Sequence, residues 1–366
     1  MKAVVATCFE SNEERLSFVY DACVSRGYET VAITSDFSHI RKEKRNNIPD
    51  YALAIKARPY KKNLSIRRIL SHKKFAEDCF RKIEKEDPDL IWLMAPANSL
   101  ISEAKKYKKK HPEKKLIIDI IDMWPESLPL GIGTGFLPLK IWKNVRSRNI
   151  GCCDALVTEC DLYQEILRNE YKGSITTIHW ARNGAAIIDE PEMPADKLSL
   201  CYIGSINNII DADRIASLIS NINYPVVLHV IGEGESTDRF LESMNRVCEV
   251  IYHGAIRDEK MKTEIFDQCH AGINIYREGL YIGLTVKCID YFEHGMPIVN
   301  NIKGDTWNFV DEYRAGVNVS ENTKINAREL IDMRFSNNSI FDLYNRHFTK
   351  GVFTEKCLKV IDEVLK

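Results

Sequence analysis

The chain has 366 residues, of which 45% are hydrophobic and 28% are charged, and its formal net charge is −1. This composition excludes a mostly disordered chain and a collagen-like fibre, and the length favours two domains over one. No hydrophobic run reaches the roughly 18 residues of a membrane-spanning helix, and the first run is shorter than the core of a signal peptide. We therefore expect a cytoplasmic protein.

The eleven cysteines are scattered along the chain, and none forms a C-x-x-C pair with another. We therefore expect neither a zinc site nor a disulfide framework. No other metal and no resident cofactor is expected.

Charge is distributed unevenly along the chain. Residues 1–183 carry eight more Lys and Arg than Asp and Glu, whereas residues 184–366 carry nine fewer. The positive charge is densest at residues 41–85, with 15 Lys and Arg against 5 Asp and Glu. Such a segment predicts an anionic partner. A membrane surface is one candidate; nucleic acid is not expected, because no helix-turn-helix, zinc-finger or RNP pattern is present.

Seven hydrophobic segments in the first half are predicted to be strands, with helical periodicity between most of them. Val, Ile and Leu dominate these segments, which is typical of a parallel sheet covered by helices on both faces. The predicted strands are 2–8, 29–35, 51–57, 89–95, 115–121, 154–160 and 174–180.

One of the predicted helices, at 65–86, has a hydrophobic face and a basic face. The expected hydrophobic face holds Ile69, Ala76, Cys79, Phe80 and Ile83. The opposite face holds Arg67, Lys74, Arg81 and Lys85. The basic face fits either a solvated helix or a weak membrane anchor, since each cation near an anionic leaflet contributes ~1 kcal/mol.

Two aspartates, Asp119 and Asp122, end a predicted strand and precede Trp124 and a glycine-rich loop that reaches residue 136. Acidic groups at this end of a strand are placed to bind a hydroxyl-rich ligand or to act as a base. The alternative is that Asp122 caps a turn and that Trp124 belongs to the core.

The alternation of strands and helices pauses at 183–197 and then restarts, which predicts a linker and a second doubly wound domain. The second set of predicted strands is 198–204, 225–232, 248–254, 271–276, 296–301 and 315–319. The tail, 341–366, has helical spacing only. Ligands of such domains bind at the carboxyl ends of the strands, so we expect a cleft there. Arg182, next to the linker, is a candidate phosphate ligand because its guanidinium fork matches phosphate oxygens.

The segment 276–301 contains the strongest candidate site. A strand is predicted to end near Tyr276, and a glycine-containing loop then leads to a helix with Thr285 at its N-cap. Lys287 lies in the first turn, where a cation is unfavourable unless an anion binds there too. Asp290 shares a face with it. A diphosphate on Lys287 and a ribose on Asp290 account for this pattern; an ordinary Lys–Asp pair on a solvated helix is the alternative.

Three further segments resemble ligand-binding motifs. Gly204 and Ser205 end a strand before a polar loop, where a parallel sheet approaches phosphate groups. The alternative is that Ser205 is a turn residue that caps only its own loop. The G-x-G at 232–234 lacks the third glycine of a dinucleotide fingerprint. Asp211 and Asp213 form an Asp-x-Asp, but helix capping is the preferred interpretation.

Taken together, the motifs resemble those of retaining, nucleotide-sugar-dependent glycosyltransferases of the GT-B fold, in the group with bacterial polysaccharide and glycoprotein glycosyltransferases. The resemblance extends over nearly the whole chain. It rests on DIIDMWPES (119–127), RNG (182–184), LCYIGS (200–205), VIGEGE (230–235), the HG of 253–254 and GLTVKCIDYFEHGMPIV (283–299).

The resemblance implies two Rossmann-like domains that face a cleft. Residues 1–182 would bind the acceptor, 183–197 would be the linker, 198–340 would bind the nucleotide sugar, and 341–366 would form a helix crossing back to the first domain. The expected reaction moves a sugar, with retention and without a metal, from a UDP-sugar to a saccharide, glycolipid or glycan hydroxyl.

The resemblance also assigns roles to residues of this chain. Asp122, Lys287 and Arg182 are the expected catalytic residues, with Asp122 on the acceptor side. The expected donor-binding residues are Gly204, Ser205, Gly254, Ile256, Arg277, Gly283, Leu284, Thr285, Lys287 and Asp290.

The chain departs from the family pattern at two places. The first glutamate of the Glu-x7-Glu found in many members falls on Ile282, and the usual basic pair after the Gly-Ser loop is missing. Arg182 or Arg277 is expected to supply the missing positive charge. Two alternatives stay open: a UDP-sugar epimerase of the same architecture, and a catalytically silent nucleotide-sugar-binding subunit.

Overall fold

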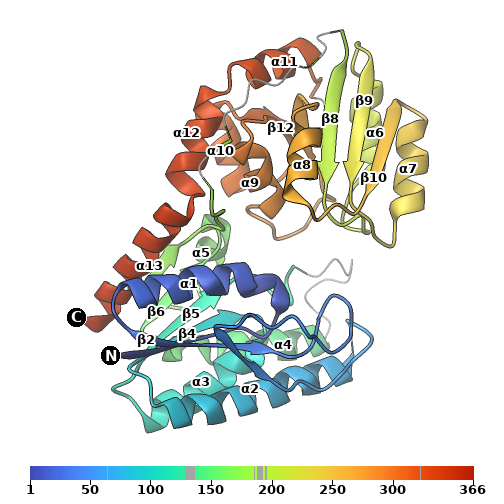
Figure 1. The fold of residues 1–366 in the computed structure, drawn as a ribbon. Coiled ribbons are helices and arrows are strands. Elements are labelled where there is room, and N and C mark those ends of the chain that lie inside the picture. The colour runs from blue at the N-terminus through green and yellow to red at the C-terminus, as the bar shows by residue number, and fades with distance from the viewer. Residues whose placement is uncertain (64, 128–136, 185, 188–192, 194–195, 322) are drawn as a thin grey trace. The chain divides into compact units, whose positions relative to one another are not determined.

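The computed structural model describes residues 1–366 apart from 64, 128–136, 185, 188–192, 194, 195 and 322. The chain forms two compact units (Figure 1). The first unit comprises Met1–Trp180 and Lys350–Lys366, and the second comprises Ala181–Thr349. The predicted linker at 183–197 and the glycine-rich loop before 136 lie partly outside the described residues, so the predicted domain boundaries stay predictions.

The first unit contains a parallel sheet with the strand order β3-β2-β1-β4-β5-β6-β7. Its strands are β1 (Lys2–Ala6), β2 (Glu29–Ser35), β3 (Ala52–Ile55), β4 (Leu90–Ala95), β5 (Lys115–Ile120), β6 (Ala155–Thr158) and β7 (Ser174–Thr177). Every residue of β4 is buried, as expected for a central strand covered on both faces.

Helices cover both faces of this sheet. They are α1 (Glu13–Ser25), α2 (Ile66–Glu86), α3 (Asn98–Lys110), α4 (Leu137–Ser147), α5 (Asp161–Leu167) and α13 (Lys350–Leu365), with 3₁₀ turns at Glu10–Asn12 and Ile150–Cys152. In Figure 1, α2 and α3 lie side by side on one face, and α1 packs with α13 on the other.

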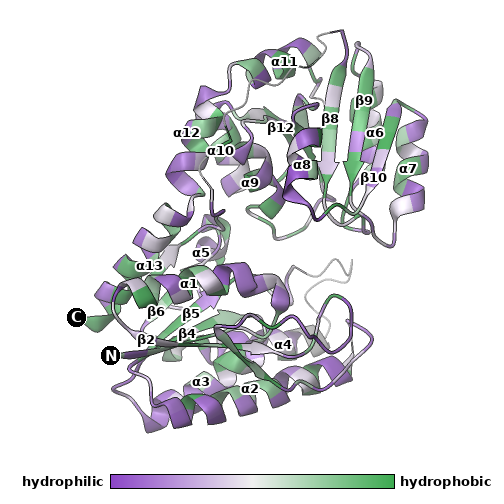
Figure 2. Ribbon diagram, viewed as in Figure 1, coloured by the Kyte–Doolittle hydropathy of each residue, from purple (hydrophilic) through white to green (hydrophobic). Residues whose placement is uncertain are grey.

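The second unit contains another parallel sheet, with the order β10-β9-β8-β11-β12-β13. Its strands are β8 (Leu198–Ile203), β9 (Val226–Ile231), β10 (Glu249–Gly254), β11 (Ala271–Asn274), β12 (Ile298–Asn300) and β13 (Gly316–Asn318). Figure 2 shows β8 and β9 largely in the hydrophobic colour and the outer helix α7 more hydrophilic. The predicted fold class, two doubly wound parallel-sheet domains, is confirmed.

The helices of the second unit are α6 (Ala212–Ser220), α7 (Thr237–Asn245), α8 (Glu259–Phe266), α9 (Val286–Glu293), α10 (Asp305–Tyr313), α11 (Ala327–Phe335) and α12 (Asn338–His347). The tail predicted as one helix at 341–366 is two helices, because α12 ends at His347 and α13 begins at Lys350. The first belongs to the second unit and the second to the first. Among the described residues, no helix combines the length and hydropathy needed to cross a bilayer.

The buried face of α2 differs from the prediction at its first turns. Ile69 was expected in the core, but it is 44% exposed. Arg68 and His72 are buried instead, in line with Phe75, Cys79 and Ile83 further along the helix. The polar face is as predicted, since Arg67, Arg81 and Lys85 are exposed and Lys74 is partly exposed.

Candidate functional site

The candidate site in the second unit lies where the direction of strand order reverses. From β8 the chain moves outward through β9 to β10, and it then returns to β11 on the other side of β8. Parallel sheets bind ligands at such switch points, beyond the carboxyl ends of the strands. Helix α9 follows β11, so its N-terminal turn begins at this place.

Helix α9 is fixed to the sheet by Tyr291. The Tyr291 hydroxyl donates to the Cys201 carbonyl at 3.1 Å and accepts from the Ile203 amide at 3.0 Å. Gly272 leaves room for the ring, because a Cβ at that position would come within 2.4 Å of it. The position of α9 over β8 and β11 is therefore set by packing and by hydrogen bonds.

The start of α9 is tied to a row of buried asparagines. Thr285 occupies the N-cap position, as predicted, but its hydroxyl donates to Asn274 Oδ1 at 2.9 Å instead of capping the helix. The Asn274 amide donates to Asn300 at 2.8 Å, and the Asn300 amide donates to Asn318 at 2.7 Å. These three asparagines end β11, β12 and β13 in matching register. Sequence reasoning missed this network, although Asn at the end of consecutive predicted strands was a visible signal.

Lys287 is a buried cation without a counterion. The residue is 8% exposed, and within the described part of the chain its Nζ has no hydrogen-bond partner. The Nζ lies 4.4 Å from the ring centroid of Tyr202 and 4.6 Å from that of Tyr276. Burial lowers the pKa of this ammonium to about 8. The cation–π contacts stabilise the ammonium in part, but no described residue supplies a charge-assisted acceptor.

The two tyrosines were not predicted, and both are held by their neighbours. The Tyr202 hydroxyl donates to the Ser205 carbonyl at 2.9 Å. The Asn301 side chain accepts from the Tyr276 amide and donates to the Tyr276 carbonyl. Tyr202 lies in β8 and Tyr276 lies two residues after the end of β11, and these two strands flank the switch point, which is why the rings meet at Lys287.

The loops that follow β8, β9 and β10 touch one another at glycines. Gly204 and Gly232 both have positive φ, and a Cβ on Gly232 would lie 2.0 Å from the Gly204 carbonyl oxygen. The Gly232 amide donates to the Gly254 carbonyl at 2.7 Å. The G-x-G motif therefore serves packing, and its Gly232 contacts two predicted donor residues: Gly204, just after β8, and Gly254, the last residue of β10. Ser205 is exposed and Ile256 half-buried.

Asp290 and Arg182, predicted as ligands for different groups, form an ion pair. Arg182 Nε lies 2.7 Å from Asp290 Oδ1, and both residues belong to the second unit. One turn further along α9, Glu293 accepts from the Tyr344 hydroxyl at 2.9 Å. Burial raises the pKa of the Glu293 carboxyl. The predicted ribose and phosphate roles of Asp290 and Arg182 stay predictions.

The remaining predicted donor residues lie in the loop between β11 and α9, and their surroundings differ. Gly283 and Leu284 are buried, and the Gly283 carbonyl accepts from the amide and the hydroxyl of Thr306. Arg277 is exposed and lines a pocket of about 370 Å³ with Arg214 and Asn301. Lys287 is not among the residues that line this pocket.

In the first unit, Asp122 follows β5 and is half-buried. Its Oδ1 accepts from the Ser127 hydroxyl at 2.5 Å. Burial raises the pKa of Asp122 to about 6, although hydrogen bonds from Ser127 and Trp124 act in the opposite direction. Near neutral pH this carboxylate is therefore poised to take up a proton.

A second carboxyl group, Glu159, interacts with Asp122 and was missed by the sequence analysis. It follows β6 and accepts from the Trp180 indole at 2.5 Å. Burial, together with the charge of Asp122, raises the pKa of Glu159 to about 8. The sequence did contain a sign of this role: Glu159 is an acidic residue near the end of the predicted strand 154–160, which follows the predicted strand that precedes Asp122.

Other acidic residues of these motifs have structural roles. Asp119 forms a buried ion pair with Arg15 at 2.8 Å and accepts from the Trp92 indole. Asp211 caps α6 by accepting from the Arg214 amide, and Asp213 pairs with Arg239. All three carboxylates are therefore engaged in contacts within the fold.

Comparison with known proteins gives a likeness of structure alone. No family model matches the sequence, and no curated protein matches it. A sucrose-phosphate synthase from Thermosynechococcus elongatus aligns over 100% of this chain and 99% of its own, with a TM-score of 0.75 and 12% identity. The lipopolysaccharide outer core galactosyltransferase WaaB aligns over 99% of both chains, with a TM-score of 0.70 and 13% identity.

A third similar structure, that of HepE from Anabaena in complex with UDP, aligns over 99% of this chain and 100% of its own. Its TM-score is 0.66 and its identity 9%. At identities this low, the structural likeness establishes the fold and nothing finer. The protein has the GT-B fold, with two Rossmann-like parallel-sheet domains in one chain.

Proposed function

We propose that this protein is a retaining glycosyltransferase that moves a sugar from a UDP-linked donor to a hydroxyl of a saccharide, glycolipid or glycoprotein glycan. The observation that carries the proposal is the Lys287 ammonium, which is buried at a switch point with no counterion among the residues that the structure describes. A buried unpaired charge is destabilising, so a site that retains one is expected to receive an opposite charge. That structures of HepE contain UDP and UDP-glucose supports a nucleotide sugar as the donor.

The donor's diphosphate would bind at the first turn of α9. The amides of Val286 and Lys287 have no intrahelical acceptor there, and the helix dipole favours an anion. Loop backbone from Gly283 to Thr285 and from Gly204 to Ser205 would flank the phosphates. Asp290 would hold the ribose, the loop from Gly254 to Ile256 would contact the base, and Arg182 and Arg277 would add positive charge.

In the proposed reaction the acceptor oxygen bonds to the anomeric carbon while the bond from that carbon to the diphosphate breaks. UDP leaves with the electron pair, and Lys287 with the helix terminus stabilises its charge, so we expect no metal requirement. Asp122 takes the hydroxyl proton. Departure and attack on one face retain the configuration, and a glycosidase-type carboxylate pair is then unnecessary.

The test is release of UDP in the presence and absence of an acceptor. A thermal-shift screen with UDP-, GDP-, ADP- and dTDP-sugars selects the donor, and a saccharide panel is then added. We expect UDP release that depends on the acceptor. Isomerised donor without an acceptor would establish the epimerase alternative, and donor binding with no turnover on any acceptor would establish the silent subunit.

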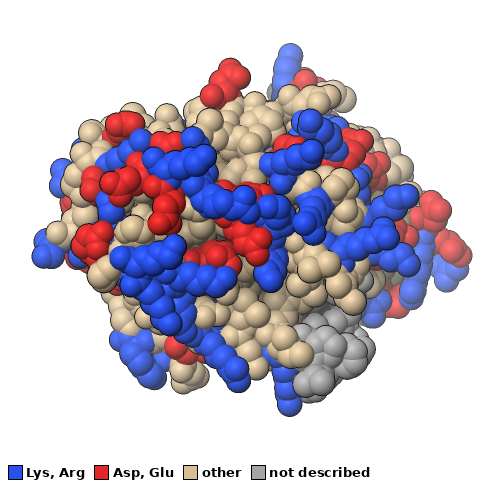
Figure 3. All heavy atoms as spheres, turned by 90° about the horizontal axis from the view of Figure 1, so that it is seen from below, with Lys and Arg blue, Asp and Glu red and all other residues tan. Residues whose placement is uncertain are grey.

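We also propose that the protein is cytoplasmic and associates peripherally with an anionic membrane through residues 41–85. Figure 3 shows many Lys and Arg side chains on the face that carries α2 and α3, interleaved with Asp and Glu. Lys74 and Arg81 both pair with Asp78, at 2.9 and 2.7 Å. Partial neutralisation of this kind weakens the attraction to a membrane without reversing it.

Reversing three charges on this face is expected to release the protein from vesicles. The triple variant Arg67→Glu, Lys74→Glu and Arg81→Glu should bind phosphatidylserine vesicles at least about tenfold more weakly, since each cation contributes ~1 kcal/mol. Co-sedimentation measures the difference.

The control is a matched reversal on the second unit, at Arg239, Arg246 and Lys260, which are exposed. Replacing these three residues by Glu changes the net charge by the same amount and should leave most of the binding to phosphatidylserine vesicles intact. Absence of wild-type binding, or equal loss in the two triple variants, contradicts the membrane proposal.

A further inference from the structure

One arginine of the first unit is buried without a carboxylate partner. Arg68, in the first turn of α2, is 1% exposed. Among the described residues it forms no ion pair, and its Nε has no hydrogen-bond partner. The other fully buried arginines differ: Arg15 and Arg146 pair with carboxylates, and Arg334 donates to three backbone carbonyls. Of these four fully buried arginines, Arg68 therefore has the fewest contacts that offset the cost of burying its charge.

The contacts of Arg68 are mainly aromatic. Its Cζ lies 3.7 Å from the ring centroid of Trp124 and 5.8 Å from that of Phe9. Its Nη1 donates to the Asn63 carbonyl at 3.0 Å, and its Nη2 lies 3.4 Å from His39 Nε2. Burial lowers the pKa of the guanidinium to about 10. The Tyr60 hydroxyl and the charge of Asp122 also act favourably on the guanidinium. Among the described residues, however, no carboxylate lies within ion-pair distance of it, and these weaker contacts do not replace a counterion.

More nitrogen-bearing side chains surround this guanidinium. His72 is 4% exposed and its Nε2 has no partner among the described residues. His39 Nδ1 lies 2.5 Å from the Tyr60 hydroxyl. The Lys42 ammonium contacts the His39 carbonyl and the Asn63 side chain. Burial, with the charge of Arg68, lowers the pKa of both His39 and Lys42.

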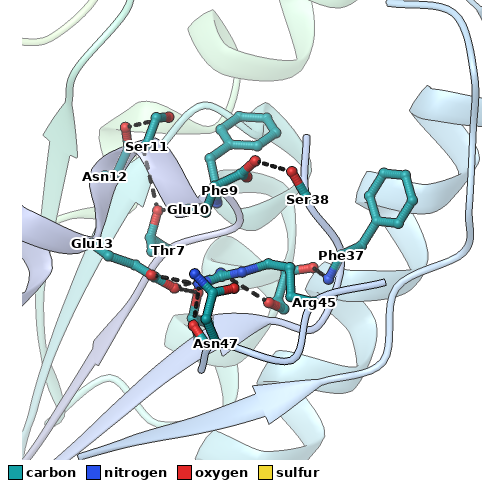
Figure 4. A network of polar contacts seen from close by, with 12 residues as sticks. Thr7, Phe9, Glu10, Ser11, Asn12, Glu13, Phe37, Ser38, Arg45 and Asn47 are labelled. Atoms are coloured by element: carbon teal, nitrogen blue, oxygen red, sulfur yellow. Dashed lines mark hydrogen bonds and ion pairs between the residues drawn. The ribbon is translucent and has the colours of Figure 1, made fainter. Parts of the chain in front are cut away.

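The segment that carries His39 and Lys42 is held in place by acidic residues that are themselves engaged. Figure 4 shows Glu10 hydrogen-bonded to Ser38, and Glu13 paired with Arg45. Glu10 also accepts from the amides of His39 and Ile40 at 2.9 and 2.8 Å. These contacts fix the loop after β2 and engage the carboxylates of Glu10 and Glu13 with groups other than Arg68.

The position of this cluster in the fold is that of a ligand site. Phe9 follows β1, and the order β3-β2-β1-β4 makes the end of β1 the switch point of the first sheet. Trp124, under the guanidinium, is two residues from Asp122. An anion at Arg68 would therefore lie in the neighbourhood of the proposed catalytic carboxylate.

We propose that Arg68, with His72, His39 and Lys42, binds a phosphate group of the acceptor, so that the acceptor substrate is a phosphate ester. This inference rests on the proposed transferase function and specifies its acceptor class. A guanidinium fork matches phosphate oxygens, and Lys and His supply further donors. Two sources share this chemistry: a sugar phosphate and a lipid-linked diphosphate.

The test measures phosphate binding directly by calorimetry, with UDP present in saturating amount so that the Lys287 site is occupied. Glucose 6-phosphate and farnesyl diphosphate are the two probes. Arg68→Met should weaken binding of the preferred probe at least about tenfold, the loss expected for one charge-assisted contact of roughly 1.5–3 kcal/mol. The probe with the higher affinity identifies the source.

The matched control is Arg67→Met, one residue earlier on the same helix but exposed; it should bind like the wild type. If Arg68→Met does not fold, His72→Phe and Arg68→Lys replace it, with the same expected direction. Equal binding in the Arg67 and Arg68 variants, or no binding of either probe to the wild type, overturns the proposal. Neither result affects UDP binding, so failure of the donor assignment is recognised separately.

Discussion

Lys287→Met is expected to weaken UDP binding by about 10- to 100-fold while the melting temperature stays within about 3 °C of the wild type or rises. A charge-assisted contact to phosphate is worth roughly 1.5–3 kcal/mol, which sets the loss of affinity. Stability should not fall, because the substitution keeps the volume of the side chain and removes a buried ammonium that has no counterion in the described part of the chain. Calorimetry and thermal unfolding measure the two quantities.

The pH dependence of wild-type binding follows from the same group. The pKa of Lys287 is about 8 in the free protein, so the ammonium is mostly charged at pH 7 and mostly neutral at pH 9. UDP affinity should therefore fall as the pH rises through this range. Lys260→Met, at an exposed lysine of the second unit, is the matched control. Unchanged UDP affinity in Lys287→Met would refute the assignment.

Asp122→Asn is expected to lower kcat by about 10²- to 10⁴-fold with little change in the donor KM, the usual contribution of a general base. The pKa of Asp122 is raised to about 6, and a base acts in its deprotonated form. The wild-type rate should therefore rise with pH and reach half its maximum near pH 6. The variant should lose this pH dependence.

Ser127→Ala provides the control for the role of Asp122. The Ser127 hydrogen bond lowers the pKa of Asp122, so its removal should shift the midpoint of the rate profile to higher pH while activity is retained. If Asp122 had only a structural role, Asp122→Asn would reduce stability, and Ser127→Ala would leave the midpoint of the pH–rate profile unchanged. Full activity of Asp122→Asn with the acceptor would contradict the assignment.

The strands were predictable because both sheets are parallel and buried on both faces. Every described strand lies within a predicted segment, and β4, with all six residues buried, illustrates the reason. Such strands appear in the sequence as continuous hydrophobic runs between helical patterns. The start of α9 was predicted as well, from Thr285 at its N-cap position.

The pairing of side chains distant in the sequence was not predictable. Arg182 and Asp290 are 108 positions apart, and nothing in the local pattern indicates that they form an ion pair. Likewise, Asn274, Asn300 and Asn318 meet only because their strands are neighbours in register. Hydrophobic periodicity specifies which face of an element is buried, but it does not specify which polar groups meet.

The error on α2 has a different cause. Hydrophobicity favoured Ile69 as core, whereas the buried stripe continues backward from Phe75 through His72 to Arg68 at helical spacing. The period was visible, but arginine and histidine are rarely buried without a partner. A residue that breaks this rule is expected at a functional site, and the proposed phosphate site is built on that exception.

The central claim is that the start of α9 receives the diphosphate of a nucleotide sugar. A crystal structure of the protein with UDP tests it most directly. We expect the diphosphate oxygens within hydrogen-bond distance of Lys287 Nζ and of the amides of Val286 and Lys287. UDP bound elsewhere, with the Lys287 ammonium still without an acceptor, would contradict the account.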